Sequence, residues 1–247
     1  MCETCGCSVP GHDHPAPADR RTVDVLHGLM DANDAAARHN REHFDRAGVL
    51  VVNLMSSPGA GKTRLLEETA RVLGDRSGDR VEMAVIEGDL ETENDAERLR
   101  AGGVRAHQIT TGSACHLDAH LIHKALHEFP LTGGDRPTDI LFIENVGNLV
   151  CPAAFDLGQH FDVVLLSTTE GDDKPAKYPV MFRAADLVVL SKADLLPVLD
   201  DFSPERAEAA LRALGVDTPM IRTGVGRNPD IAGWIDWLDR QLERSRA

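Results

Sequence analysis

The sequence predicts an α/β fold: a doubly wound, mainly parallel seven-stranded sheet. Short β-rich runs alternate with helical stretches, and most of the runs are apolar along their whole length, as strands buried on both faces are. A glycine-rich loop follows the first run and opens a helix, which is where parallel sheets of this kind bind phosphate. The expected strands are residues 49–55, 81–87, 104–109, 139–144, 162–167, 186–191 and 219–223.

The chain divides into three parts by composition. Residues 1–20 contain Cys, Gly, His, Pro and Asp with almost no large apolar side chain, so we expect a flexible N-terminal metal-binding tail. Residues 21–47 have a helical pattern with apolar anchors such as Leu26 and Phe44, and Gly48 supplies a stop, which predicts a lead-in helical segment. Residues 48–247 form the main domain.

Composition excludes several function classes. The formal charge of −14 would repel a phosphate backbone, which argues against nucleic acid as a partner. No apolar run approaches the roughly 18 residues that span a bilayer, and no charged-then-apolar leader begins the chain, so we expect a cytoplasmic protein that binds no membrane. Five cysteines in a reducing compartment favour metal binding or chemistry over permanent disulfides.

The first element after Gly48 is a strand that leads into the phosphate loop SSPGAGKT, residues 56–63. Gly59 and Gly61 let backbone N–H groups curl around a phosphate, Lys62 neutralises the β and γ oxygens, and the Thr63 hydroxyl can ligate Mg²⁺. Position 56 is Ser where the usual pattern has Gly. The predicted nucleotide-binding residues here are Ser57, Pro58, Gly59, Ala60, Gly61, Lys62, Thr63 and Arg64.

Two carboxylates are predicted to complete the triphosphate site together with Lys62 and Thr63. Glu144 ends the fourth strand and Gly147 follows it, an arrangement that suits Mg²⁺ coordination and a backbone N–H directed at the γ-phosphate. Asp89 lies just past the strand at 81–87, where it either approaches the same Mg²⁺ or is only solvated. We therefore assign Lys62, Thr63, Asp89 and Glu144 to catalysis.

The sixth strand leads into LSKADLLP, which predicts the base site. Asp194 can accept two hydrogen bonds from the N1–H and exocyclic amine of guanine, which adenine does not offer, while the Lys192 stem covers the ring. Position 191 is Ser where GTPases commonly have Asn. The expected nucleotide is GTP.

Two further cysteines accompany the nucleotide motifs. Cys115 and His116 are placed at the start of a helix, and Cys151 follows Glu144 by seven residues. Thiolate and imidazole suit Zn²⁺ or Ni²⁺. The alternative for each cysteine is a small buried hydrophobe.

Five stretches together identify the chain as resembling HypB, the GTPase family for nickel insertion into [NiFe]-hydrogenase, of the SIMIBI class of P-loop GTPases. The stretches are NLMSSPGAGKT, TTGSACHLDA, ENVGNLVCPAAFDLG, EGDDKPAKYP and LSKADLLP, in this order over nearly all of residues 48–200. The resemblance implies GTP-dependent homodimerisation, a metal site of Cys115, His116 and Cys151, and a dimer contact at Lys174. It also implies a maturation partner protein and the hydrogenase large subunit as partners.

The tail motif CETCGC is similar to a metal motif at the start of some members of this family. Cys2, Cys5 and Cys7, with the α-amine freed by removal of Met1, would give four N and S ligands for square-planar Ni²⁺. His12 and His14 either extend this capacity or do nothing. His116, His120, His123 and His127 have helical spacing opposite Leu117, Leu121 and Ala125, and for His120, His123 and His127 this is typical of a solvated polar face.

These observations predict a GTP-hydrolysing nickel metallochaperone that uses GTP-dependent dimerisation as a switch. Its expected cofactors and cargo are GTP, Mg²⁺, Ni²⁺ and Zn²⁺. Two alternatives are a urease-type nickel accessory GTPase, whose motif is Cys-Pro-His, and a metal-buffering protein whose nucleotide site is only structural.

Overall fold

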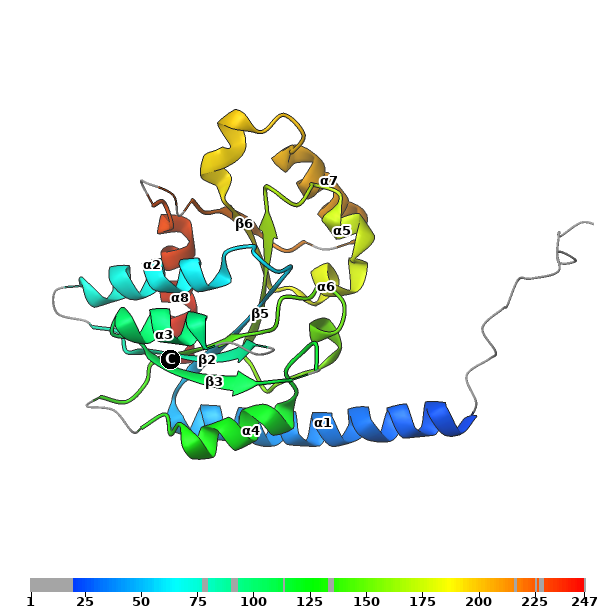
Figure 1. The fold of residues 1–247 in the computed structure, drawn as a ribbon, viewed down its shortest axis with the longest axis vertical. Helices are drawn as coiled ribbons and strands as arrows, with labels where there is room; N and C mark the ends of the chain where they lie inside the picture. Colours follow the sequence, from blue (N-terminus) through cyan, green and yellow to red (C-terminus); the bar gives the residue numbers. More distant parts are fainter. Residues whose placement is uncertain are drawn as a thin grey trace, which may run out of the picture.

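The structure is a computed structural model that describes residues 20–76, 80–89, 93–112, 114–132, 136–215, 217–224, 226 and 229–246. Its centre is one seven-stranded sheet in the order β3-β2-β4-β1-β5-β6-β7, and all six strand pairings are parallel. The predicted fold class is confirmed (Figure 1). The strands are β1 Leu50–Ser56, β2 Met83–Asp89, β3 Arg105–Thr110, β4 Ile140–Glu144, β5 Phe161–Ser167, β6 Leu187–Ser191 and β7 Met220–Arg222.

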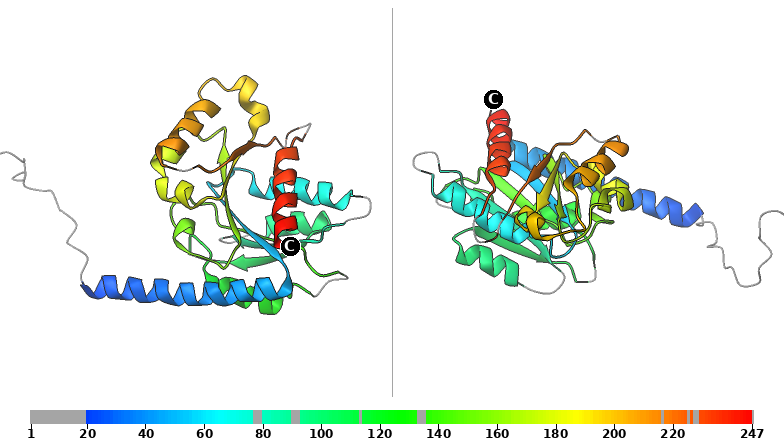
Figure 2. Two further views of the ribbon diagram at one scale, coloured as in Figure 1. Left: turned by 180° about the vertical axis from the view of Figure 1, so that it is seen from behind. Right: turned by 90° about the horizontal axis from the view of Figure 1, so that it is seen from above.

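Helices cover both faces of the sheet (Figures 1 and 2). In chain order the α-helices are α1 Arg20–Ala47, α2 Lys62–Gly74, α3 Asn94–Ala101, α4 Ala119–Glu128, α5 Lys174–Lys177, α6 Pro179–Ala184, α7 Pro204–Ala213 and α8 Ala232–Ser245. Two 3-10 turns, η1 Pro152–Ala154 and η2 Ala193–Val198, follow β4 and β6. Among the residues listed above, no helix combines the length and the apolar character that a membrane span needs.

The strands β1, β4 and β6 are mostly apolar because both of their faces are buried, whereas the edge strands β3 and β7 are more polar and partly exposed. Along β1, Leu50, Val52 and Leu54 point into the core beneath α2, α3 and α8, whereas Val51 and Met55 point to the opposite face. That opposite face is covered by α1 and α4 at one end of the sheet and by α6 and α7 at the other. Alternation with period 2 therefore gives a central strand such as β1 two hydrophobic sides rather than one.

Helix α1 belongs to the packed structure of the domain. Phe44 is fully buried against β1 and α4, and Asn40 is fully buried as well. The Asn40 Nδ2 donates to the Ala119 carbonyl at 2.8 Å and to the Leu157 carbonyl at 3.1 Å, while Arg41 Nε donates to the Gly158 carbonyl at 2.7 Å. The helix thus fixes the start of α4 and the loop before β5.

The predicted helical position of Cys115 and His116 is wrong, because α4 begins only at Ala119. Asp118 is extended at the N-cap, and its side chain accepts a hydrogen bond from the Leu121 N–H at 2.8 Å. His116 therefore lies in the preceding loop and does not share a helix face with the later histidines. Leu121 is only half-buried, and the buried face of α4 consists of Ile122, Ala125 and Leu126.

Candidate functional site

The phosphate loop joins the buried strand β1 to helix α2 at the carboxyl edge of the sheet. Gly59 and Gly61 have φ of 74° and 97°, values that side chains with a Cβ rarely adopt, so both glycines are required by the turn. Lys62 is the first residue of α2 and is buried. Its Nζ lies 3.2 Å from Ser56 Oγ and 4.0 Å from Glu144 Oε1, and these contacts hold the Lys62 ammonium group over the loop. The Arg64 side chain is turned along α2 toward Glu67 and Glu68.

Two buried carboxyls meet beside this loop. Glu144 at the end of β4 accepts a hydrogen bond from Thr63 Oγ1 at 2.9 Å, and Glu87 of β2 lies opposite it in the strand register. Burial raises the pKa of Glu144 to about 6 and, with the nearby Glu144 carboxylate, raises that of Glu87 to about 8. Glu87 was not among the residues predicted from the sequence, although a carboxylate near the end of an otherwise apolar strand is a signal for such a site.

These carboxyls fit a divalent cation. Oε2 of Glu144 and Oε2 of Glu87 are buried without a hydrogen-bond partner, and hard cations such as Mg²⁺ prefer carboxylate and hydroxyl oxygens. Mg²⁺ would be held by Thr63 and Glu144. Asp89 is the last residue of β2 rather than a residue past the strand, and its backbone carbonyl accepts the Thr111 N–H at 2.9 Å.

The loop after β4 contacts the phosphate loop directly. A Cβ on Gly147 would lie 2.8 Å from Pro58 Cα and 2.9 Å from Pro58 N, so only glycine allows this close approach. A shift of one loop toward the other would therefore displace it. The motif spacing alone predicted a role for Gly147, and the structure places it in contact with the phosphate loop.

The predicted base-site residues lie together after β6. Lys192 has a left-handed backbone with φ of 55°, its carbonyl accepts the Thr168 hydroxyl at 2.9 Å, and its Nζ donates to Thr169 Oγ1 at 3.3 Å. Asp194 is exposed and borders a cavity of about 270 Å³. Ser191, the departure from the usual Asn, donates from Oγ to the Ala60 carbonyl at 2.7 Å and so supports the phosphate loop.

Two residues near the base site were not anticipated. Gly224, after β7, lies so close to Asp194 that a Cβ there would be 3.0 Å from Asp194 Oδ1. Burial raises the pKa of Glu170, an effect opposed by Ser57 and by the charges of Lys174, Lys192 and Lys62. Glu170 thus connects the phosphate loop electrostatically to Lys174, which is half-exposed at the start of α5 with its Nζ 5.4 Å from the Tyr178 ring centre.

The structure brings Cys115, His116 and Cys151 together although their loops are far apart in sequence. One ligand atom from each lies within 4.8 Å of the others, and no other trio of His, Cys, Asp or Glu in the described ranges does so. Burial lowers the pKa of His116, whose ring stacks on Phe155 at a centroid distance of 4.0 Å. Hydrogen bonding to Cys115 raises the pKa of the Cys151 thiol. A neutral imidazole and two thiols that must lose their protons suit a soft or borderline metal ion.

Hydrogen bonds tie this trio to the nucleotide motifs. Asn145, adjacent to Glu144, accepts the Leu117 N–H on its Oδ1 at 3.1 Å, next to His116. Asn148, adjacent to Gly147, donates from Nδ2 to the Cys115 carbonyl at 3.3 Å. The segment that contacts the phosphate loop therefore also holds the backbone of Cys115 and of Leu117, the residue after His116.

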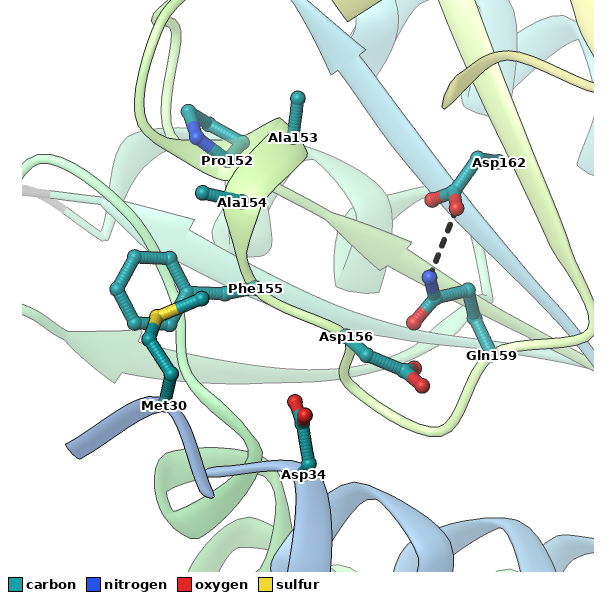
Figure 3. A pocket seen from close by; sticks show the side chains of 9 residues that line it. All are labelled: Met30, Asp34, Pro152, Ala153, Ala154, Phe155, Asp156, Gln159 and Asp162. Atoms are coloured by element: carbon teal, nitrogen blue, oxygen red, sulfur yellow. Dashed lines mark hydrogen bonds between the residues drawn. The ribbon is translucent and has the colours of Figure 1, made fainter. Parts of the chain in front are cut away.

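A cavity of about 500 Å³ lies beside the segment that follows Cys151, and the phosphate loop does not line it. Figure 3 shows its lining, with Met30 and Asp34 of α1 facing the turn at Pro152–Phe155. Asp162 at its edge accepts a hydrogen bond from Gln159 Nε2 at 2.9 Å, and burial raises its pKa to about 6. Cys2, Cys5, Cys7, His12 and His14 lie outside the described residues, so the tail site remains a prediction.

Comparison with known proteins agrees with the fold and the motifs. Residues 50–221 match the family described as CobW/HypB/UreG, nucleotide-binding domain. The chain is 47% identical over 234 residues to the hydrogenase maturation factor HypB of Azotobacter chroococcum, covering 94% of this chain and 73% of the relative. It is 46% identical over 231 residues to HypB of Escherichia coli K12, with 94% and 77% covered.

Solved structures of the same family superpose closely. The crystal structure of HypB from Helicobacter pylori in complex with nickel has a TM-score of 0.78 at 42% identity, over 87% of this chain and 95% of that one. HypB from Archaeoglobus fulgidus has a TM-score of 0.75 at 37% identity, over 86% of this chain and 100% of that one. This chain belongs to the HypB family of hydrogenase maturation factors, within the CobW/HypB/UreG group of P-loop proteins.

Proposed function

We propose that this chain hydrolyses GTP to GDP and phosphate and uses that reaction to deliver nickel for assembly of the [NiFe]-hydrogenase active site. The observation that carries the proposal is the contact between the two sites. Asn145 and Asn148 hold the backbone beside His116 and at Cys115, while their neighbours Glu144 and Gly147 contact Thr63 and Pro58. The nickel complex of the Helicobacter pylori relative supports the choice of metal.

The nucleotide would be held by groups with distinct tasks. Lys62, buried at the start of α2, supplies positive charge to the β and γ oxygens, and the loop glycines supply backbone N–H donors. Asp194 accepts from guanine. Mg²⁺ on Thr63 and Glu144 would neutralise charge that develops on the phosphates during hydrolysis.

The switch follows from the shared segment 144–151. Loss of the γ-phosphate removes a contact for the Gly147 backbone, and the same segment bears Cys151 at its far end. The geometry of Cys151 relative to Cys115 and His116 would then differ between the GTP and GDP states. A change of ligand geometry alters metal affinity, so hydrolysis can convert a holding site into a releasing site.

We infer a homodimer as the working form. The exposed Cys115 at a twofold axis would meet its own copy, because an isologous interface presents the same patch twice. Lys174 at the start of α5 would contact the second subunit in the GTP state. The expected partners are a maturation protein and the hydrogenase large subunit, with Zn²⁺ as a competing occupant of the interface site.

A urease-related role is the second candidate. A relative from Helicobacter hepaticus, 44% identical over 223 residues, is named a hydrogenase/urease maturation factor. Nickel transfer to purified hydrogenase large subunit and to urease apoprotein, each with GTP, distinguishes the two clients.

The test measures GTP turnover and nickel transfer in parallel. Lys62→Ala should abolish turnover and transfer, and Cys115→Ala should abolish transfer while leaving turnover within a few-fold, because Cys115 contacts no phosphate element through its side chain. Lys177→Ala, an exposed lysine paired with Asp173, is the matched control for Lys62. GTP turnover that persists in Lys62→Ala would contradict the nucleotide site, and transfer that persists in Cys115→Ala would contradict the metal site.

A further inference from the structure

Five histidines that the nucleotide and Cys/His sites do not use gather where α1 packs on α4. His39 and His43 are one turn apart on α1, and His120, His123 and His127 lie on α4. The two helices run side by side in both Figures 1 and 2. The sequence had suggested only a solvated polar face on α4, because the contribution of α1 depends on tertiary packing.

The rings of this cluster contact one another. His123 Nε2 lies 3.2 Å from His127 Nε2, with ring centroids 4.7 Å apart. The His39 ring meets the other side of His123 with a centroid distance of 5.0 Å in an edge-on arrangement. Burial and then the neighbouring histidines lower the pKa of His123.

The distance between the two Nε2 atoms suits two ligands on one metal ion. With metal–nitrogen bonds of about 2.0–2.1 Å, the two nitrogens of a tetrahedral site are about 3.3–3.4 Å apart. Residues at i and i+4 project from the same helix face, so α4 presents the pair without distortion of its backbone. The same distance also fits a hydrogen bond between two neutral rings, and the experiment below separates these cases.

The surroundings of the cluster differ from those of two other histidines, His107 and His160. His107 lies 3.8 Å from a Glu128 oxygen and His160 lies 3.0 Å from an Asp45 oxygen, so each has a carboxylate partner. In the part of the chain that the structure describes, none of the five cluster histidines has such a partner. No carboxylate in that part of the chain therefore competes with a metal ion for these rings, and the contact between His123 and His127 is the one described above.

We propose that His123 and His127 form a clamp for a divalent transition metal ion such as Ni²⁺ or Zn²⁺. The His39 ring of α1 contacts His123, but its nitrogens do not lie within 4.8 Å of both Nε2 atoms, so it would become the third ligand only after its ring turns toward the ion. Both Nε2 atoms act as acceptors in the bound state, so the ring that donates in the free protein changes tautomer and its proton moves to Nδ1 through solvent. No net proton has to leave the neutral pair. The ion would link α1 to α4 at a site separate from Cys115, His116 and Cys151.

The first experiment counts Ni²⁺ by equilibrium dialysis in the full chain with its other metal ligands silenced. The background carries Cys2→Ser, Cys5→Ser, Cys7→Ser, Cys115→Ser, Cys151→Ser, His12→Gln and His14→Gln. One Ni²⁺ equivalent should remain and should disappear when His123→Gln and His127→Gln are added. Lys124→Gln, an exposed change on the same helix, should leave that equivalent in place. A background protein that binds no Ni²⁺, or that keeps its equivalent after both histidine changes, would overturn the proposal.

A second experiment needs no silenced background and identifies the ligands directly. In the otherwise unchanged protein, His123→Gln with His127→Gln should remove one Ni²⁺ equivalent, and the remainder should still respond to Cys115→Ala. Imidazole NMR spectra with Zn²⁺ should show the His39, His123 and His127 signals shifting together at one equivalent. Shifts of His123 and His127 without His39 would reject the third ligand, and no shift would show a ring-to-ring hydrogen bond only.

Discussion

The buried carboxyl of Glu87 should make the stability of the free protein depend on pH. Only 3% of this side chain is exposed, and its Oε2 has no hydrogen-bond partner. Burial, followed by the charges of Glu144, Asp95 and Asp89, raises its pKa from 4.5 to about 8. Ionisation of Glu87 therefore costs far more free energy in the folded protein than in the unfolded chain.

The sign follows from a folded-state pKa that lies above the unfolded value. The stability that protonated Glu87 provides is fully present below about pH 4.5 and is lost as pH rises through about 8. Linkage gives a loss on the order of 3 kcal/mol between about pH 5 and about pH 8. Glu87→Gln keeps the shape of the protonated acid and cannot ionise. Its free energy of unfolding, relative to that of the unchanged protein, should therefore rise by this amount between about pH 5 and about pH 8.

The assay is urea unfolding without nucleotide and with chelator, at about pH 5 and about pH 8. Glu97→Gln, an exposed acid on α3, is the control and should change the pH dependence little. Addition of Mg²⁺ and GTP should reduce the effect of pH, because a nearby cation favours the carboxylate. A difference between Glu87→Gln and the unchanged protein that is the same at both pH values would refute this reasoning.

Three other predictions test separate contacts. Asn40→Ala leaves two buried carbonyls without their donor and should lower the free energy of unfolding by about 2–4 kcal/mol, whereas the exposed Arg46→Ala should change it by less than about 0.5 kcal/mol. Gly147→Ala forces a Cβ against Pro58, and overpacking of this kind costs about 1–3 kcal/mol. GTP binding measured by titration should therefore weaken by about 5- to 150-fold. Unchanged GTP affinity would show that the two loops move apart freely. Asp194→Asn should weaken GTP binding and improve binding of xanthosine triphosphate, and unchanged GTP affinity would count against the base site.

Local sequence patterns were sufficient for the sheet and for most of the nucleotide site. All seven expected strands form. For the apolar runs among them the reason is that such a run between turn residues has few alternatives to a buried parallel strand. The phosphate loop follows from positive φ at Gly59 and Gly61, a property of the residues themselves. These features depend on neighbours in sequence, which a reader of the sequence can see.

Features that depend on distant packing were not predictable in the same way. Glu87 becomes notable only because β2 pairs with β4 and places it opposite Glu144. His116 lies outside the helix because Asp118 caps α4, and the bond from the Leu117 N–H to Asn145 of another loop is a contact that spacing within the motif cannot reveal. The role of Asn40 as a clamp on α4 needs the position of α1, and no local pattern gives that position.

The coupling between nucleotide and metal is the central claim, and one titration tests it most directly. The protein should carry Cys2→Ser, Cys5→Ser, Cys7→Ser, His12→Gln, His14→Gln, His123→Gln and His127→Gln, so that Cys115, His116 and Cys151 are the thiol and imidazole site under test. Ni²⁺ affinity is then measured with GDP and with a non-hydrolysable GTP analogue. The account predicts affinities that differ by roughly 5- to 150-fold, with the reciprocal change in nucleotide affinity on adding Ni²⁺. Equal Ni²⁺ affinities in the two nucleotide states would contradict it.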